Sequence, residues 1–375
     1  MMMQLRMQRR TLAIATAAIC SAFLFSALTV ESAYAADKVI NLKIANFFPP
    51  PSKQAKITQE FGEELERRSE GRIKVQYFAG GSLLTGPAMF KGIETGIADI
   101  GYSHVYYTPG RMPVSEGMGL PLGVPTGWVG AHMAYDFYQK FKPKEFGGVK
   151  VLAIHANGPS MVISKRPVAK LEDMKGLTIR APGIPGDIVK ALGGTPTPTP
   201  MMEVYDSIAK GVNEAVWGPY ETLKTFRFVE VAKNVTVSWQ IGASFPFFLV
   251  MNRKSYDRLP PDLKSLVDAM SGEYQERFAL MWNEIDFDGK DYAKDKGVKY
   301  LELSEQEGAR WQKAVEPVLD DYVKAMVGKG HKEAEVKGWI AYMKERIKYW
   351  TEKQMQYKIA SPTGPAGLRP EAYVK

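Results

Sequence analysis

The sequence predicts an α/β protein, because strand-like and helix-like segments alternate near its start. Residues 38–46 alternate apolar and polar side chains, as a strand with one buried face does. After Ser52, which can cap a helix, apolar residues recur at every fourth position. Residues 72–78 and 98–103 then read as strands, with a helix-like segment over 90–96 between them. Short connections in such an alternation favour a sheet with helices on its faces.

The same pattern continues through the middle of the chain. Further strands are predicted over residues 149–155, 176–180, 215–218 and 247–252, and helices over 128–141 and 202–210. The strand over 247–252 is fully apolar, as expected in the centre of a sheet.

From Pro260 onward the apolar spacing is helical. Ser304 and Glu307 form a capping-box pattern, and Pro317 is expected to kink the helix that follows. A last helix carries apolar residues on one face and lysines on the other. Such a helix can lie on a membrane surface, although a solvated polar face is the commoner explanation.

The first 36 residues predict a cleavable signal peptide. Arg6, Arg9 and Arg10 form a positive region, residues 11–30 carry no charge, and Ala33-Tyr34-Ala35 follows as a small-x-small cleavage pattern. A membrane anchor is the alternative, since an apolar stretch of this length can span a bilayer. The cleavage pattern favours export, so we expect a periplasmic protein.

The chain that remains after cleavage excludes several functions. Cys20 is the only cysteine and leaves with the leader, so we expect no disulfide and no thiolate site. The full chain has a net charge of +8, and residues 1–36 carry three basic residues and one acidic residue, which leaves +6. This charge is spread out, so no nucleic-acid partner is expected. No later apolar segment is long enough to span a membrane, so the mature protein is not expected to be membrane-inserted.

No motif indicates a metal, a cofactor or a catalytic group. His104, His132, His155 and His331 lie far apart in sequence and show no metal-ligand spacing. There is no nucleophile elbow and no phosphate-binding loop, and the glycines over residues 117–123 miss the dinucleotide pattern. We expect no cofactor, no metal and no catalysis, although a pair of acid and base carboxylates would leave no local signature.

Arg180 is the candidate binding residue. It stands at the carboxyl end of the strand predicted over 176–180, directly before Pro182-Gly183 turns the chain. Ligands of open α/β sheets bind at the carboxyl ends of strands, and arginine grips a carboxylate with two parallel hydrogen bonds. Alone, an arginine in this position is more often part of a surface ion pair.

In its longer motifs the chain resembles the DctP family, the solute receptors of TRAP transporters. The resemblance runs from residue 39 to about residue 325. It rests on the order and spacing of GRIKVQYFAGGSL (71–83), KGIETGIADIGYS (91–103), LEDMKGLTIRAPG (171–183), VYDSIAKGVNEAVWGP (204–219) and FPFFLVMNRKSYDRLP (245–260).

The resemblance implies a two-lobed periplasmic-binding-protein fold with crossing strands and a long bridging helix from Leu263 to about Lys296. Lobe 1 would hold residues 37–158 and about 247–280, and lobe 2 residues 159–246 and about 281–330. Residues 331–375 would form a C-terminal helical extension. A small organic acid would bind in the cleft, the lobes would close over it, and TRAP membrane subunits would be the partners.

The resemblance also implies the site. Arg180 matches the arginine that forms the salt bridge to the ligand carboxylate. The other expected ligand-binding residues are Phe47, Phe48, Ser103, His104, Ser160, Trp217, Gly218, Tyr220 and Phe245. Tyr106, Tyr107 and Trp128 are further aromatic residues expected near the cleft.

Two departures from the family pattern point to the kind of acid. The crossing segment over 157–162 lacks the second arginine of many members, and Val216-Trp217-Gly218 stands where members place polar residues. Both changes favour a monocarboxylate with an apolar or aromatic body over a C4-dicarboxylate. The alternatives are a dicarboxylate receptor, a sensor-type receptor, and an exported enzyme with His155 or Glu221 as its base.

Overall fold

The computed structural model describes residues 39–373. The predicted signal peptide lies outside these residues. The helices and strands that form the two sheets and their cover, apart from the C-terminal helices, are β1 (Ile40–Asn46), α2 (Lys53–Arg68), β2 (Ile73–Phe78), α3 (Met89–Thr95), β3 (Ile100–His104), α4 (Pro113–Glu116), α5 (Gly127–Phe141), β4 (Val149–Ala156), β5 (Met161–Ser164), β6 (Thr178–Arg180), α6 (Ile184–Ala191), β7 (Thr195–Thr197), α7 (Val204–Ala209), β8 (Ala215–Gly218), α8 (Glu221–Thr225), β9 (Asn234–Val237), β10 (Pro246–Asn252), α9 (Arg253–Asp257), α10 (Pro261–Lys294) and β11 (Lys299–Glu302).

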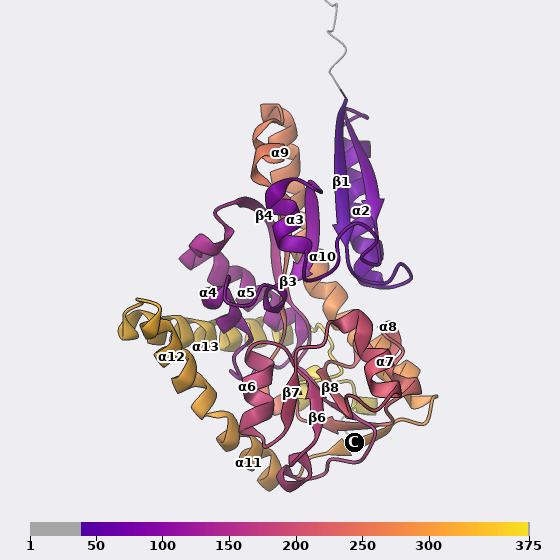
Figure 1. Cartoon of the computed structure of the whole chain (residues 1–375), viewed down its shortest axis with the longest axis vertical. Coiled ribbons are helices and arrows are strands. Elements are labelled where there is room, and N and C mark those ends of the chain that lie inside the picture. The colour runs from indigo at the N-terminus through magenta and orange to yellow at the C-terminus, as the bar shows by residue number, and fades with distance from the viewer. Residues whose placement is uncertain (1–38, 374–375) are drawn as a thin grey trace, which may run out of the picture.

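The first lobe is built on a five-stranded sheet in the order β2-β1-β3-β10-β4, in the upper half of Figure 1. Strand β1 pairs in parallel with β2 and β3, whereas β10 is antiparallel to β3 and β4. Successive side chains of β10 point to opposite faces: Phe248 contacts Phe90 of α3, and Phe247 contacts Trp282 of α10. The strand is therefore covered on both faces, which explains its fully apolar sequence.

The second lobe is built on a six-stranded sheet in the order β11-β9-β5-β8-β6-β7, in the lower half of Figure 1. Strand β6 lies between β7 and β8 and is parallel to both. Strand β5 joins this parallel part to β9 through antiparallel pairs. The two sheets and their helices confirm the two-lobed α/β fold class.

Two segments cross between the sheets, and they bind each other. Residues 157–160 lead from β4 to β5, and residues 238–245 lead from β9 to β10. Asn157 N donates to Phe245 O at 3.2 Å, and Ser160 N donates to Ala243 O at 2.8 Å. The crossing segments thus form a paired connection at the base of the space between the lobes.

Helix α10 contacts elements of both lobes along its 34 residues. It packs on β4, α2 and α5 of the first lobe and on α8 of the second, and Figure 1 shows it running from one lobe into the other. A Cβ atom at Gly289 would lie 2.2 Å from the carbonyl oxygen of Tyr220, so glycine allows the close approach of α8. The bridging helix predicted from the sequence is confirmed.

The C-terminal helices are α11 (Glu305–Val315), α12 (Pro317–Gly328) and α13 (Glu333–Gln356). Ser304 Oγ accepts from Glu307 N at 3.2 Å, which confirms the Ser304 half of the predicted capping box. The Glu307 carboxylate accepts from Leu171 N and Trp311 Nε1 instead of the Ser304 backbone. Pro317 divides α11 from α12. The apolar face of α13 packs on α5, so the first lobe covers it. Among residues 39–373, no helix has both the length and the apolar character that crossing a membrane demands.

Candidate ligand-binding site

The side chain of Arg180 is fully buried and only partly hydrogen-bonded. It ends strand β6, and its Nε donates to the carbonyl oxygen of Thr199 at 2.9 Å. Its Nη1 and Nη2 atoms have no hydrogen-bond partner among the described residues. Burial lowers the pKa of Arg180, and the nearby Tyr107 hydroxyl acts in the opposite direction. A buried cation without a partner is costly, so the two terminal nitrogens of Arg180 are suited to bind an anion.

The guanidinium of Arg180 borders a narrow cavity to which both lobes contribute. The cavity has a volume of only about 20 Å³. Its lining consists of Phe47, Phe48, His104, Asn157, Arg180, Met201, Pro219, Glu221, Phe226, Phe245 and Phe247. Arg180 is the one residue of this lining with a permanent positive charge.

The wall of the cavity is mainly aromatic. The rings of Phe47 and Phe48 are 4.3 Å apart, and Phe48 reaches Phe226 of the second lobe at 6.0 Å. The ring of Phe245 lies 5.6 Å from that of His104. Burial and the charge of Arg180 hold the pKa of His104 well below its ordinary value, so this imidazole is neutral. The wall can therefore contact an apolar body without offering it a second charge.

A carboxyl group stands in the same lining. Glu221 begins α8, is only 3% exposed, and accepts from Gln54 Nε2 at 3.0 Å. Burial raises its pKa to about 7. Its backbone N donates to Oδ1 of Asp286, which fixes the start of α8 against α10.

Half of the predicted site residues line the cavity. Those that do are Phe47, Phe48, His104, Arg180 and Phe245. Those that do not are Ser103, Ser160, Trp217, Gly218 and Tyr220. Their role in binding stays a prediction, and in this structure it would require them to move.

The five residues outside the lining are buried behind it or in the sheets. Ser103 Oγ donates to Gly86 O at 3.0 Å, and Gly218 pairs with Met161 across the second sheet. The ring of Tyr220 meets that of Tyr300 at 5.7 Å, on the side of α10. Ser160 Oγ and Trp217 Nε1 are buried with no hydrogen-bond partner in the described part of the chain.

Of the three further aromatic residues expected near the cleft, two lie beside the cavity and one does not. Tyr106 and Tyr107 lie next to the lining, where they contact Phe245 and His104. Trp128 was expected near the cleft, and this prediction is wrong. Its indole donates to Glu276 and its ring contacts Trp350, because α13 covers this face of α5.

Six lining residues were not among the predicted ligand-binding residues. They are Asn157, Met201, Pro219, Glu221, Phe226 and Phe247. Asn157 and Pro219 directly follow strands β4 and β8, so the strand-end rule that selected Arg180 would also have selected them. Phe226 and Met201 come from loops that only the folded chain brings to the cavity.

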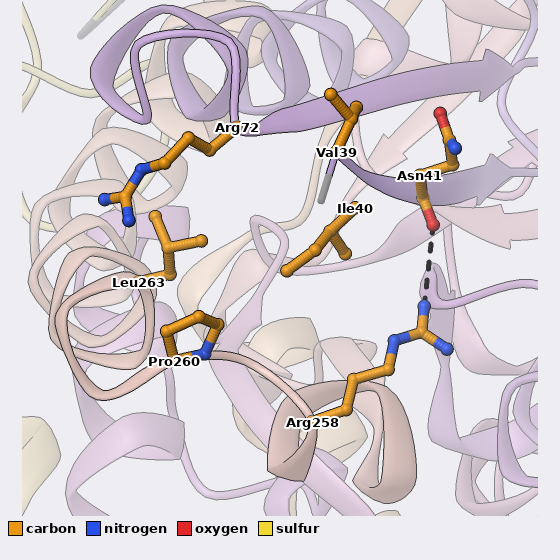
Figure 2. Close-up of a pocket in the computed structure, with 7 residues that line it drawn as sticks. All are labelled: Val39, Ile40, Asn41, Arg72, Arg258, Pro260 and Leu263. Carbon is orange, nitrogen blue, oxygen red and sulfur yellow. Dashed lines mark hydrogen bonds between the residues drawn. The ribbon is translucent and has the colours of Figure 1, made fainter. Parts of the chain in front are cut away.

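A larger hollow lies at the opposite ends of the first sheet's parallel strands, shown in Figure 2. It has about 540 Å³ and is lined by Val39, Ile40, Asn41, Arg72, Arg258, Pro260 and Leu263. Arg258 pairs with Asp99 at 3.1 Å, and Arg72 pairs with Asp262. Because both arginines are already engaged and the amino ends of strands meet here, Arg180 marks the better candidate site.

Comparison with known proteins identifies the class. The family model of bacterial extracellular solute-binding proteins, family 7 (DctP), matches residues 44–325. A solute-binding protein of Albidiferax ferrireducens is 27% identical over 290 residues, which cover 72% of this chain and 83% of that protein.

Solved structures agree with the family model. A TRAP periplasmic solute-binding protein from Desulfovibrio salexigens is 32% identical, with a TM-score of 0.71, covering 83% of this chain and 97% of that one. A marine metagenome TRAP solute-binding protein specific for aromatic acid ligands, solved with 3-hydroxybenzoate, shares the fold at 23% identity. Its TM-score is 0.78, and the match covers 83% of this chain and 98% of that one.

The fold and the family match define a two-lobed solute receptor. The chain belongs to the DctP family of bacterial extracellular solute-binding proteins, which includes periplasmic solute receptors of TRAP transporters.

Proposed function

We propose that this receptor binds a small monocarboxylate with an apolar or aromatic body and delivers it to TRAP membrane subunits. Arg180 holds the carboxylate, and the phenylalanine wall contacts the body of the acid. The observation that carries the proposal is the buried guanidinium whose two terminal nitrogens have no partner in the described chain.

The charge balance of the lining favours one carboxylate over two. Arg180 offers two terminal nitrogens, which match the two oxygens of a single carboxylate. Its neighbours in the lining are neutral or, in the case of Glu221, acidic. A second carboxylate of a dicarboxylate would therefore be buried without a cation, which is costly.

Relatives bind ligands of the proposed chemistry. The marine metagenome protein is specific for aromatic acids. The Desulfovibrio salexigens structure is an open complex with the C-terminus of a symmetry mate in its ligand-binding site.

Binding also requires that the cavity opens and closes. Ligand pockets in proteins commonly hold about 300–1,000 Å³, far more than the present cavity admits. The crossing segments and α10 connect the lobes, so a hinge between them would let the acid enter. Closure on a bound anion would then favour the closed state, because the salt bridge forms only there. The predicted signal peptide would place this cycle in the periplasm.

A ligand screen tests the proposal. Thermal shifts are measured with a panel of benzoates, arylacetates, aliphatic monocarboxylates and C4-dicarboxylates, and native mass spectrometry identifies any copurified acid. We expect aryl or other apolar monocarboxylates to raise the melting temperature most. A clear preference for succinate or malate contradicts the proposal, as does turnover of a bound acid.

A further inference from the structure

The cavity has a second polar position besides Arg180. Glu221 lines the same cavity as Arg180 but has different hydrogen-bond partners. The Glu221 carboxyl group interacts with Gln54 and Thr225, and its backbone N donates to Asp286, whereas Arg180 donates to Thr199. No ion pair joins the two side chains in the described chain. An elongated ligand held by Arg180 can thus meet Glu221 with its other end.

The carboxyl group of Glu221 has no cationic partner among the described residues. Lys53, Lys56 and Lys224 line a separate hollow that Glu221 also borders, but no ion pair joins any of them to Glu221 in the described chain. Lys53 and Lys224 instead pair with Asp288, at 3.1 and 3.5 Å. The burial of Glu221 without a cation raises its pKa to about 7. Near neutral pH the group is therefore protonated much of the time, and it can then donate as well as accept a hydrogen bond.

Unused hydrogen-bonding capacity surrounds Glu221. Gln54 gives its Nε2 to Glu221, while its Oε1 is buried with no partner in the described chain. The hydroxyl of Tyr102 is likewise buried with no partner in the described chain. Burial, and to a smaller extent the charge of Glu221, raise the pKa of Tyr102 well above its ordinary value. Natural proteins rarely leave such groups unsatisfied unless they serve a ligand or a bound water.

We propose that Glu221 is a specificity-determining residue that hydrogen-bonds an uncharged hydroxyl or carbonyl group of the ligand while Arg180 holds its carboxylate. This inference rests on the proposed function and narrows the ligand to hydroxy- or oxo-substituted monocarboxylates. A ligand with a second carboxylate binds less well, because that carboxylate would be buried beside the carboxyl group of Glu221, in a lining whose one permanent cation is Arg180.

Calorimetric titrations with matched probes test the inference. The probes are benzoate, 3-hydroxybenzoate, 4-hydroxybenzoate and isophthalate. The proteins are wild type, Glu221→Gln and Glu221→Leu. Glu116→Gln is the control, because burial also raises the pKa of Glu116 to about 7 although it lies outside the cavity lining.

We expect wild type to bind one of the hydroxybenzoates roughly tenfold more tightly than benzoate, the value of one good hydrogen bond. Glu221→Leu removes this preference with little change for benzoate, and Glu116→Gln keeps it. Glu221→Gln keeps the preference, because an amide also donates and accepts, and it binds isophthalate more tightly than wild type does.

Three results overturn the inference. They are equal binding of benzoate and both hydroxybenzoates by wild type, an unchanged preference in Glu221→Leu, or isophthalate bound as tightly as a hydroxybenzoate. If Glu221→Leu does not fold, the near-isosteric Glu221→Gln takes its place. An isophthalate affinity of Glu221→Gln equal to that of wild type then also overturns the inference, because removing the carboxyl group should strengthen isophthalate binding. Failure of wild type to bind any monocarboxylate, in these titrations and in the ligand screen, instead refutes the proposed function itself.

Discussion

Asn157 and Phe245 join the two crossing segments through a pair of hydrogen bonds. The backbone N of Asn157 donates to the carbonyl oxygen of Phe245 at 3.2 Å, and the backbone N of Phe245 donates to Asn157 Oδ1 at 2.8 Å. Both residues line the cavity, and the Phe245 ring centre lies 5.4 Å from the Arg180 guanidinium carbon. Asn157 and Phe245 thus belong both to the connection between the lobes and to the lining of the candidate site.

Replacing the Asn157 side chain should weaken both stability and binding. Asn157→Leu leaves the buried N–H of Phe245 without its acceptor, which costs about 1–3 kcal/mol. Urea unfolding measures this loss, and titration with the best acid of the screen should show weaker binding. A variant as stable as wild type contradicts the role of this bond.

Replacing Arg180 should stabilise the unliganded protein, in contrast to most buried substitutions. Arg180→Met keeps much of the side-chain length and removes a buried charge that no carboxylate compensates. We expect the free energy of unfolding to rise by on the order of 1 kcal/mol. This value already subtracts the cost of losing the hydrogen bond to Thr199. Arg180→Lys keeps the charge and should show no gain. A stability loss of several kcal/mol in Arg180→Met would show that the guanidinium serves mainly the fold.

The contact between α8 and α10 predicts opposite effects for two glycines of the same helix. Gly289→Ala places a Cβ atom 2.2 Å from the Tyr220 carbonyl oxygen, so the helix must shift. We expect a loss of about 1–3 kcal/mol, as for other overpacked sites. A Cβ atom at Gly272 meets no atom within 4 Å, so Gly272→Ala should stabilise α10 by up to about 1 kcal/mol. Equal effects in thermal unfolding would contradict the packing described here.

The raised pKa of Glu221 predicts a pH dependence of stability. Burial raises the pKa from 4.5 to about 7, so the folded chain keeps a proton that the unfolded chain releases at lower pH. This contribution is complete below pH 4.5 and is lost as the pH rises to about 7; its size is up to about 3 kcal/mol. The surroundings of Glu221 also include the charged residues Lys53, Lys224, Asp286 and Asp288. These residues are the same in wild type and in a Glu221 variant, so they do not contribute to the difference between the two pH profiles.

Glu221→Gln should therefore flatten the fall in unfolding free energy between pH 4.5 and about pH 7. Glu63→Gln, a change of an exposed carboxylate on α2, serves as the control and should leave the pH profile as it is. Identical profiles for wild type and Glu221→Gln would show that the carboxyl group of Glu221 is ionised in the folded protein throughout this range.

Local sequence patterns predicted most of the fold, because helices and strands follow short-range rules. The Ser52 cap, the apolar strand β10 and the break at Pro317 all appear where periodicity and capping placed them. Strands β7, β9 and β11 were missed, and β5 was anticipated only as the end of a crossing strand over 157–162. Each has only three or four residues, too few for an alternation to stand out, and the neighbouring strands determine their pairing.

The site was predicted only in part, for a physical reason. Arg180 could be found because its place at a strand end and its chemistry are both local. Whether Trp217 or Phe226 faces the cavity depends on how two lobes meet, which no local pattern encodes. Glu221 was noted as a possible base, yet the lack of a cationic partner among the described residues is visible only in three dimensions.

A thermodynamic cycle on Arg180 tests the central claim most directly. Benzoate and its uncharged analogue benzamide, or the corresponding pair for the best acid of the screen, are titrated into wild type and Arg180→Gln. Wild type should prefer the carboxylate by roughly a hundredfold, as expected of a buried charge-assisted pair, and Arg180→Gln should lose that preference. If Arg180→Gln still prefers the carboxylate as strongly as wild type does, Arg180 is not the residue that holds the anion.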